Sequence, residues 1–265
     1  RVVSFVGTLF GDEEVTISAQ IDGAIQEISA DLGDPVEKNQ SLARIEDAQL
    51  RARLREAEAH LAKARADEQR GRQLATTKVI SEVEYETMKT GVAVAEAQRD
   101  TLSVMVQYAD VRSPLKGSVA RRMVSSGEYV RPGTPLFALV ADDPLKLRGD
   151  VPERYAPELK PGQDVRIRVD AFGGKEFPGR LSRISPASNR ENRSIAVEIL
   201  VANGERTLKP GFFANAAIVT RTDDQAVMIP QEAVTTFAGV TKVFVIEGDK
   251  ARERQVRPGT RAADG

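Results

Sequence analysis

Two stretches of the chain repeat the same pattern of apolar and polar positions. The second copy follows the first at a constant offset of 94 residues, the separation of Gly23 from Gly117 and of Gly33 from Gly127. Each copy alternates apolar residues as a β-strand does and is too short to bury a core alone. An ungapped offset indicates an internal repeat, so we predict that the copies pack together as one split β module. The first copy contains Gly23, Ile25, Gly33, Asp34, Val36, Leu42 and Ile45, and the second contains Gly117, Val119, Gly127, Glu128, Val130, Leu136 and Leu139.

The segment between the repeats has the clearest helical periodicity in the chain. Two series of mostly small or apolar residues recur at alternating spacings of three and four, which is the seam of a heptad repeat. A short polar segment, residues 76–81, joins them and predicts an antiparallel helical hairpin. At 1.5 Å per residue, an arm of about 30 residues would reach roughly 45 Å. The first seam is Leu50, Leu54, Ala57, Leu61, Ala64, Glu68, Gly71 and Ala75, and the second is Tyr85, Met88, Val92, Ala95, Arg99, Leu102 and Val106.

Two charged residues occupy seam positions towards the tip of this hairpin. Glu68 lies on the first arm and Arg99 on the second. They are expected either to pair with each other or to extend separately out of a loosely packed coil. The sequence leaves both alternatives open.

The remainder of the chain reads as β structure. Short apolar strands separated by glycine and proline turns at regular intervals predict a barrel or sandwich. The predicted fold is mainly β, with an inserted antiparallel coiled-coil hairpin, a split lipoyl-like module, a β-barrel and a terminal β domain in an elongated array. We expect the N-terminal strands to pair with the C-terminal β segments. The predicted parts are 1–18 (N-terminal strands), 19–48 and 111–142 (half-motifs), 49–110 (hairpin), 143–221 (barrel) and 222–265 (membrane-proximal β domain).

Composition limits the function classes. The chain has 38 basic and 39 acidic residues and a net charge of −1, so it lacks the electrostatic footprint of a nucleic-acid-binding protein. It has no cysteine, which removes disulfides, thiol chemistry and cysteine metal sites. No apolar run approaches the length of a membrane span. An export signal or an inner-membrane anchor, lipid or helix, is therefore expected upstream of residue 1.

An enzyme or a carrier is poorly supported. His60 is the only histidine and sits on a polar helix face, so neither a nucleophile–base pair nor a nitrogen-rich metal site is predicted. The methionines are scattered, and packing explains them better than metal binding. A lipoyl or biotinyl carrier needs a lysine on the turn between its half-motifs, but here the chain enters a helix after Asp47. We expect no enzymatic activity, no cofactor and no metal.

The order of these parts resembles the periplasmic adaptor (membrane fusion) proteins of tripartite efflux pumps, particularly those of the resistance-nodulation-division type. The resemblance covers nearly the whole chain. It rests on the ordered motifs Gly23-Ala-Ile through Gly33-Asp-Pro-Val36, Leu42-Ala-Arg-Ile-Glu-Asp47, Arg112-Ser-Pro114, Gly127 through Pro132-Gly133, Leu208-Lys-Pro-Gly211 and Ile229-Pro-Gln-Glu-Ala-Val234.

The resemblance implies a function and a set of partners. Such an adaptor links an inner-membrane transporter to an outer-membrane channel in the periplasm for the export of small molecules. The resemblance also implies self-association into a ring, expected to be hexameric, and no binding of nucleic acid. An adaptor of an ABC-type exporter and a structural scaffold without a transport role are the alternatives. The hairpin length, about four heptads per arm, favours the proton-driven pumps, because adaptors of protein-secreting ABC systems generally have much longer hairpins.

The same resemblance marks three residues at the hairpin tip. Family members carry an arginine, a leucine four residues later and a serine seven beyond, which dock the outer-membrane channel; Arg70, Leu74 and Ser81 stand at these spacings. Ser81 has a structural alternative, because Glu84 follows three residues later and completes a capping box for the second helix. Arg70 alone would be a solvated helix charge, and Leu74 alone a residue near the end of its helix.

Overall fold

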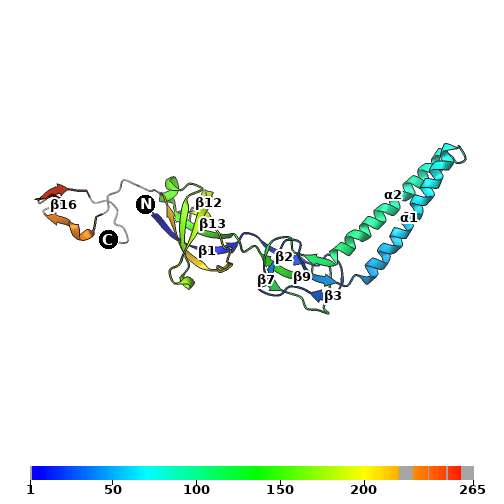
Figure 1. Ribbon diagram of the computed structural model, residues 1–265, viewed down its shortest axis with the longest axis horizontal. Coiled ribbons are helices and arrows are strands. Elements are labelled where there is room, and N and C mark those ends of the chain that lie inside the picture. Colours follow the sequence, from blue (N-terminus) through cyan, green and yellow to red (C-terminus); the bar gives the residue numbers. More distant parts are fainter. Residues whose placement is uncertain (1, 221–228, 238, 249, 258–265) are drawn as a thin grey trace. The chain divides into compact units, whose positions relative to one another are not determined.

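The computed structural model describes residues 2–220, 229–237, 239–248 and 250–257 (Figure 1). It divides into two compact units, Val2–Thr220 and the part beyond residue 220. The larger unit contains a closed β-barrel, a module of two small sheets and a pair of long helices. The predicted class, mainly β with an inserted helical hairpin, is confirmed.

The two repeats interleave within the module. Both of its sheets contain strands from both copies, because neither copy alone satisfies its strand edges. One sheet has the order β2 (Glu14–Ser18), β9 (Pro135–Val140), β7 (Gly117–Arg122) and β4 (Pro35–Val36). The other has the order β6 (Asp110–Arg112), β5 (Ser41–Ile45), β3 (Gly23–Ile28) and β8 (Tyr129–Val130).

Backbone hydrogen bonds between the copies are reciprocal. The amide of Gly33 donates to the carbonyl of Val119 at 2.9 Å, and the amide of Gly127 donates to the carbonyl of Ile25 at 2.8 Å. The two hydrogen bonds are equivalent, because Gly127 is the counterpart of Gly33 in the repeat and Val119 is the counterpart of Ile25. Gly33 and Gly127 have φ values of +88° and +82°, in the left-handed region that favours glycine. The repeated glycines therefore mark equivalent turns around an internal pseudo-two-fold axis.

The repeated apolar positions fill the module's core. Ile25, Leu42 and Ile45 of the first copy are fully buried, as are their counterparts in the second. Gly117 is needed for close backbone approach, because a Cβ there would lie 2.0 Å from the carbonyl oxygen of Val140. Substitution would force apart strands that pair directly.

The inserted segment forms α1 (Ala48–Thr76) and α2 (Glu82–Tyr108), which lie side by side (Figure 1). Every predicted seam residue on both helices is buried or half-buried, as expected for a heptad seam. Glu68 and Arg99 do not pair: Glu68 accepts a hydrogen bond from the Tyr85 hydroxyl, whereas Arg99 forms an ion pair with Asp100. The Tyr85 hydroxyl on the facing helix is therefore the donor that satisfies Glu68, in place of Arg99.

Six strands close the barrel around its own apolar core. Alternate residues of each strand point inwards, and the first strand shows this over most of its length. Two short 3₁₀ helices, Glu153–Glu158 and Asp170–Phe172, lie in its connections. The strand order is β1 (Val2–Gly11), β10 (Leu145–Pro152), β13 (Ser194–Val201), β12 (Glu176–Asn189), β11 (Asp164–Arg168) and β14 (Phe213–Val219), which closes onto β1.

The N-terminal residues pair differently from the expectation. β1 pairs antiparallel with β14 and β10 and so completes the barrel, while β2 joins β9 in the module. Closing the barrel leaves neither β14 nor β10 with a free edge, which is the physical reason for this choice.

The described part of the second unit is a separate three-stranded sheet. It has the order β15 (Val234–Phe237), β16 (Val240–Glu247) and β17 (Lys250–Gln255), preceded by the 3₁₀ turn Gln231–Ala233. Residues 222–228, 238, 249 and 258–265 of the predicted 222–265 domain, with Met228 among them, lie outside the described residues. Among the helices that the structure describes, none is long and apolar enough to cross a membrane.

Candidate docking site at the hairpin tip

The turn between the two helices is tightly closed by hydrogen bonds. At the end of α1, the backbone amide of Thr77 donates to the carbonyl of Gln73. The hydroxyl of Thr76 donates to the backbone carbonyl of Arg72 at 2.8 Å. Lys78 takes a positive φ of 58°, which reverses the chain direction. The end of α1 thus has several of its otherwise free carbonyls satisfied.

Ser81 caps α2, as its sequence context predicts. Its Oγ accepts from the amide of Glu84 at 3.2 Å, and its own amide donates to the Glu84 carboxylate at 2.8 Å. These two bonds form the expected capping box. The hydrogen bonds from the backbone amide and then the hydroxyl of Ser81 hold the pKa of Glu84 below its usual value. Ser81 is also exposed, so capping leaves its other side open to a partner.

Arg70 and Leu74 lie one turn apart on the same side of α1. The side chain of Arg70 is 67% exposed and pairs with Asp67 on its own helix. Leu74 is 41% exposed although it is large and apolar. An exposed guanidinium carries donors suited to carboxylates or carbonyls, and Leu74 adds an adjacent apolar contact.

Two further apolar side chains at the tip were not identified from sequence. Val79 in the turn is 67% exposed, and Val83 in the first turn of α2 is 76% exposed. The available signal was that neither fits the heptad seam, so neither has an internal packing role. With Leu74 they make the tip more apolar than a purely solvated turn requires.

A small polar cluster joins α1 to the start of α2 next to the tip. The Tyr85 hydroxyl donates to Oε1 of Glu68 at 2.7 Å and accepts from Nε of Arg72 at 3.2 Å. Arg72 also lies 3.3 Å from Glu68. Gly71 is buried beside Tyr85 and Met88, and its missing side chain lets α2 approach closely. These contacts link α1 to the first turns of α2.

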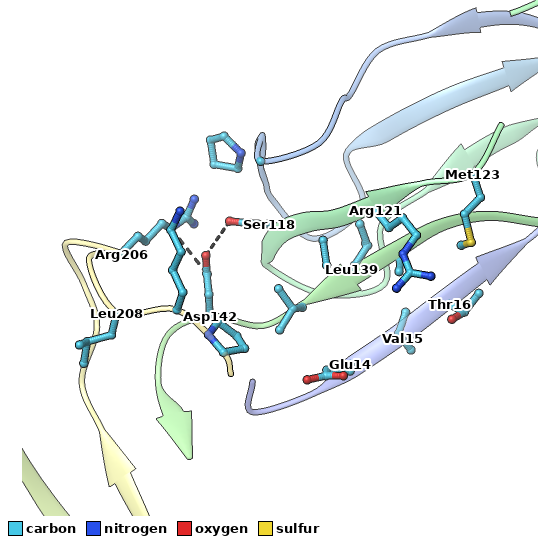
Figure 2. Close-up of a pocket in the computed structure, with 17 residues that line it drawn as sticks. Glu14, Val15, Thr16, Ser118, Arg121, Met123, Leu139, Asp142, Arg206 and Leu208 are labelled. Carbon is cyan, nitrogen blue, oxygen red and sulfur yellow. Dashed lines mark hydrogen bonds and ion pairs between the residues drawn. The ribbon is translucent and has the colours of Figure 1, made fainter. Parts of the chain in front are cut away.

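Apart from the hairpin tip, the structure has a recess where the module meets the barrel (Figure 2). Its volume is about 890 Å³, and it separates β2 and β7 from the loop that precedes β14. Asp142 is buried there, accepts from Ser118 Oγ at 2.5 Å and lies 3.6 Å from Nε of Arg206. Both oxygens of this carboxylate therefore already interact with neighbouring side chains. Within the described residues, no cluster of histidine, cysteine and acidic side chains is arranged to hold a metal ion.

Asn203 links the module to the barrel through hydrogen bonds of its backbone and its side chain. Its amide donates to Asp143 at 2.9 Å, and its Nδ2 donates to the carbonyls of Asp142 and Leu208 at 2.8 and 2.9 Å. Its Oδ1 accepts from the amide of Leu208 at 3.0 Å. Asn203 therefore fastens the strand leaving the module to a loop of the barrel. In the sequence it reads only as part of an Asn-Gly turn.

Two family models match the chain. Residues 13–142 match the CzcB-like barrel-sandwich hybrid domain, and residues 147–222 match the CusB-like β-barrel domain. The nodulation protein NolF of Rhizobium meliloti is 26% identical over 99% of this chain and 75% of its own length. The solvent efflux pump periplasmic linker SrpA of Pseudomonas putida is 27% identical over 89% of this chain. The chain spans only 66% of the length of SrpA.

A solved structure shares the fold. A chimeric protein of MacA that contains the α-hairpin domain of MexA from Pseudomonas aeruginosa superposes with a TM-score of 0.72, at 22% identity over 82% of this chain and 80% of that chain. The barrel-sandwich module, barrel and helical hairpin define an adaptor of the membrane fusion type. The chain belongs to the periplasmic adaptor (membrane fusion protein) family of efflux pumps.

Proposed function

We propose that the chain is the periplasmic adaptor subunit of a tripartite efflux pump and links an inner-membrane transporter to an outer-membrane channel for the export of small molecules. The observation that carries the proposal is the hairpin, which leaves the module after β5, returns to it at β6 and ends in an exposed tip. A projecting helical pair with a capped, partly apolar end suits docking against other helices.

Each part has a role in this proposal. The hairpin, residues 49–110, reaches the channel through Arg70, Leu74 and Ser81. The module of residues 19–48 and 111–142 supports the hairpin. The barrel, residues 143–221, and the terminal β domain, residues 222–265, hold the transporter. The N-terminal segment 1–18 contributes strands to the barrel and the module.

The proposal is for a non-enzymatic protein that acts in the periplasm. Its family consists of adaptors rather than enzymes, and relatives are named as periplasmic linkers. Copies of the chain associate side by side into a ring; the number six and an inner-membrane anchor upstream of residue 1 stay predictions from the family resemblance.

An adaptor of an ABC-type exporter is the alternative. Helices of 29 and 27 residues favour the proton-driven pumps, because adaptors of protein-secreting ABC systems are expected to have longer arms. Purification of the membrane complex with this chain as bait, followed by identification of the transporter, distinguishes the two.

Docking at the tip is tested by Arg70→Asp. We expect loss of export from cells that depend on this chain, measured as accumulation of a fluorescent pump substrate, with unchanged helicity and melting temperature. An exposed charge contributes under about 0.5 kcal/mol to folding. Arg53→Asp is the matched control, since Arg53 is an exposed arginine near the base of the same helix. Normal export by both Arg70→Asp and Leu74→Ala would show that these residues do not dock a channel.

Ser81 separates docking from capping. Ser81→Ala removes the cap and is expected to cost about 1 kcal/mol of stability. Ser81→Asp still caps α2 and places a carboxylate at the helix N-terminus, where it is favoured. If Ser81 contacts the channel, aspartate restores stability but not export. Recovery of both would assign Ser81 to capping alone.

A further inference from the structure

The recess between the module and the barrel has a floor of small and apolar side chains. This floor is the outer face of the strands β2, β9 and β7. Ala138 and Val140 of β9 lie along it, and Thr16 of β2 pairs with Ala138. The opposite wall is the loop before β14, which contributes Leu208 and Pro210. A volume of about 890 Å³ is within the range of cavities that bind small organic ligands.

A β-bulge places a cation in this recess. Val119 of β7 is buried in the module's core opposite Leu139, and strict alternation would point Arg121 into the same core. The pairing shifts by one residue at Ala120, so Arg121 pairs with Ala138, and both bulge residues are exposed. Figure 2 shows the Arg121 side chain lining the recess and directed from β7 towards β2. The bulge thus turns a guanidinium away from the core and into the recess.

The internal repeat shows how this position differs between the two copies. The counterparts of Arg121 and Ala138 in the first copy are Glu27 and Arg44, which also follow a bulge and also face each other. There a carboxylate stands opposite a guanidinium, an arrangement in which each charge stabilises the other. In the second copy the position opposite the charge is alanine. Arg121 therefore has no cross-strand counter-charge, and the small alanine leaves space beside its guanidinium.

The charges that line the recess leave two cations unpaired. An oxygen of Asp142 lies 3.6 Å from Nε of Arg206, so these two charges offset each other. Among the residues that the structure describes, the side chains of Arg121 and Lys209 form no hydrogen bond or ion pair. Both are exposed, and Glu14 on β2 is the remaining acidic side chain of the lining. The recess therefore carries a surplus of positive charge next to its apolar floor.

We propose that the recess binds a small amphipathic anion, a carboxylate or phosphate monoester with an apolar body. Its charged head binds the guanidinium of Arg121, whose donors suit either group. Its body covers Ala138 and Val140 and contacts the barrel's loop at Pro210. Lys209, on the same loop, attracts the head through its positive charge. An inorganic ion would leave the apolar floor uncovered, whereas an apolar body buries it.

The wall contributed by the barrel is already fixed in the absence of a ligand. Asn203 donates to the carbonyl of Leu208 and accepts from its amide, and Arg206 takes a positive φ of 51° beside Asp142. A fixed wall lowers the conformational entropy that binding costs. Because the ligand contacts the module and the barrel together, its binding should stabilise the joint between them. The recess is not part of the hairpin tip, so binding here does not depend on channel docking.

Calorimetric titration of the full chain with octanoate and with octyl phosphate, below their micelle-forming concentrations, tests the site. We expect saturable binding, and the anion that binds more tightly identifies the head group. Acetate, which lacks the apolar body, should bind at least about tenfold more weakly than octanoate. Octyltrimethylammonium, with the same body and the opposite charge, should not bind. Absence of saturable binding by either octyl anion would overturn the site, and so would equal affinity for octyltrimethylammonium.

Substitutions in the recess test where the anion binds. Arg121→Gln should lower the affinity by about tenfold or more, because it removes a charge-assisted contact. Ala138→Glu should have a similar effect, since it gives Arg121 a cross-strand counter-charge like that of its counterpart in the first copy. Lys209→Gln should cause a smaller loss. Arg131→Gln is the matched control, because Arg131 is an exposed arginine of the same module outside the recess.

Thermal unfolding provides a second measurement on the same variants. Without ligand, each should melt near the wild-type temperature, since the substituted side chains are exposed or half-buried. The octyl anion that binds should raise the melting temperature of the wild-type chain and of Arg131→Gln, and should raise it less in Arg121→Gln and Ala138→Glu. Unchanged binding in both of these recess variants would show that the anion binds elsewhere as an adventitious ligand only, and would overturn the site.

Discussion

At the scale of single residues, the joint between module and barrel depends on one buried amide. Asn203 is 4% exposed and uses its side chain as both donor and acceptor. The side chain bonds to backbone groups of Asp142 and Leu208, and these hydrogen bonds are buried. Water therefore cannot replace a hydrogen bond that is lost there. A buried polar group left without a partner costs more than the bond itself contributes.

Replacing this amide should therefore destabilise the barrel. We expect Asn203→Ala to lower the free energy of unfolding by about 2–3 kcal/mol. The substitution leaves three backbone groups without their hydrogen-bond partner, namely the amide and the carbonyl of Leu208 and the carbonyl of Asp142. Chemical denaturation measures the effect. Asn215→Ala is the control: Asn215 is exposed, donates to Asp170 at 3.3 Å and should cost under about 0.5 kcal/mol. Equal losses for the two variants would contradict the role given to Asn203.

At the scale of elements, two glycines in the hairpin have opposite environments. Gly91 on α2 is exposed, and a Cβ there would have no neighbour within 4 Å. Gly71 on α1 is buried, and its Cβ would lie 2.4 Å from Sδ of Met88. Glycine within a helix costs conformational entropy at both positions, but only at Gly71 does close packing require it.

Alanine substitution should separate these roles. Gly91→Ala is expected to raise the stability of the hairpin by about 1 kcal/mol through helix propensity. Gly71→Ala should give no such gain, because Met88 must move to admit the methyl group. Circular dichroism during thermal unfolding reports helix content for both variants. An equal gain at both positions would show that the tip is packed less closely than the structure indicates.

At the scale of the whole molecule, the barrel and the module have separate apolar cores. The hairpin adds little to either. Leu50 packs against the module's core, and Ala109, just after α2, is buried in it and accepts a hydrogen bond from the amide of Ile45 at 2.8 Å. The module should therefore fold without the rest of the hairpin.

Excision of the hairpin tests this independence. Replacing residues 52–107 with a short glycine-containing turn should preserve hydrogen-exchange protection of β5 and β9, because Leu50 and Ala109 remain. A longer excision, residues 49–109, should weaken that protection by removing both contacts. Loss of protection in the shorter variant would show that the module depends on its helices.

Much of this architecture could be predicted because it is local. Gly33 and Gly127 mark turns through their own backbone preference, and the seams follow from the periodicity of neighbouring residues. The Ser81 capping box spans only four residues. In the candidate site, the exposed Val79 and Val83 were missed because exposure depends on how the two helices meet.

The sequence by itself determined the repeat, the hairpin and the cap, since each is encoded by residues close together or by a spacing that occurs twice. Only the tertiary structure decided the partners of β1, of Glu68 and of Asn203. A strand's alternation states which face is buried but not which edge it joins, and a polar side chain does not state which distant donor will be nearest. Those choices depend on how the chain closes its sheets and satisfies its buried polar groups, which involves residues far apart in sequence.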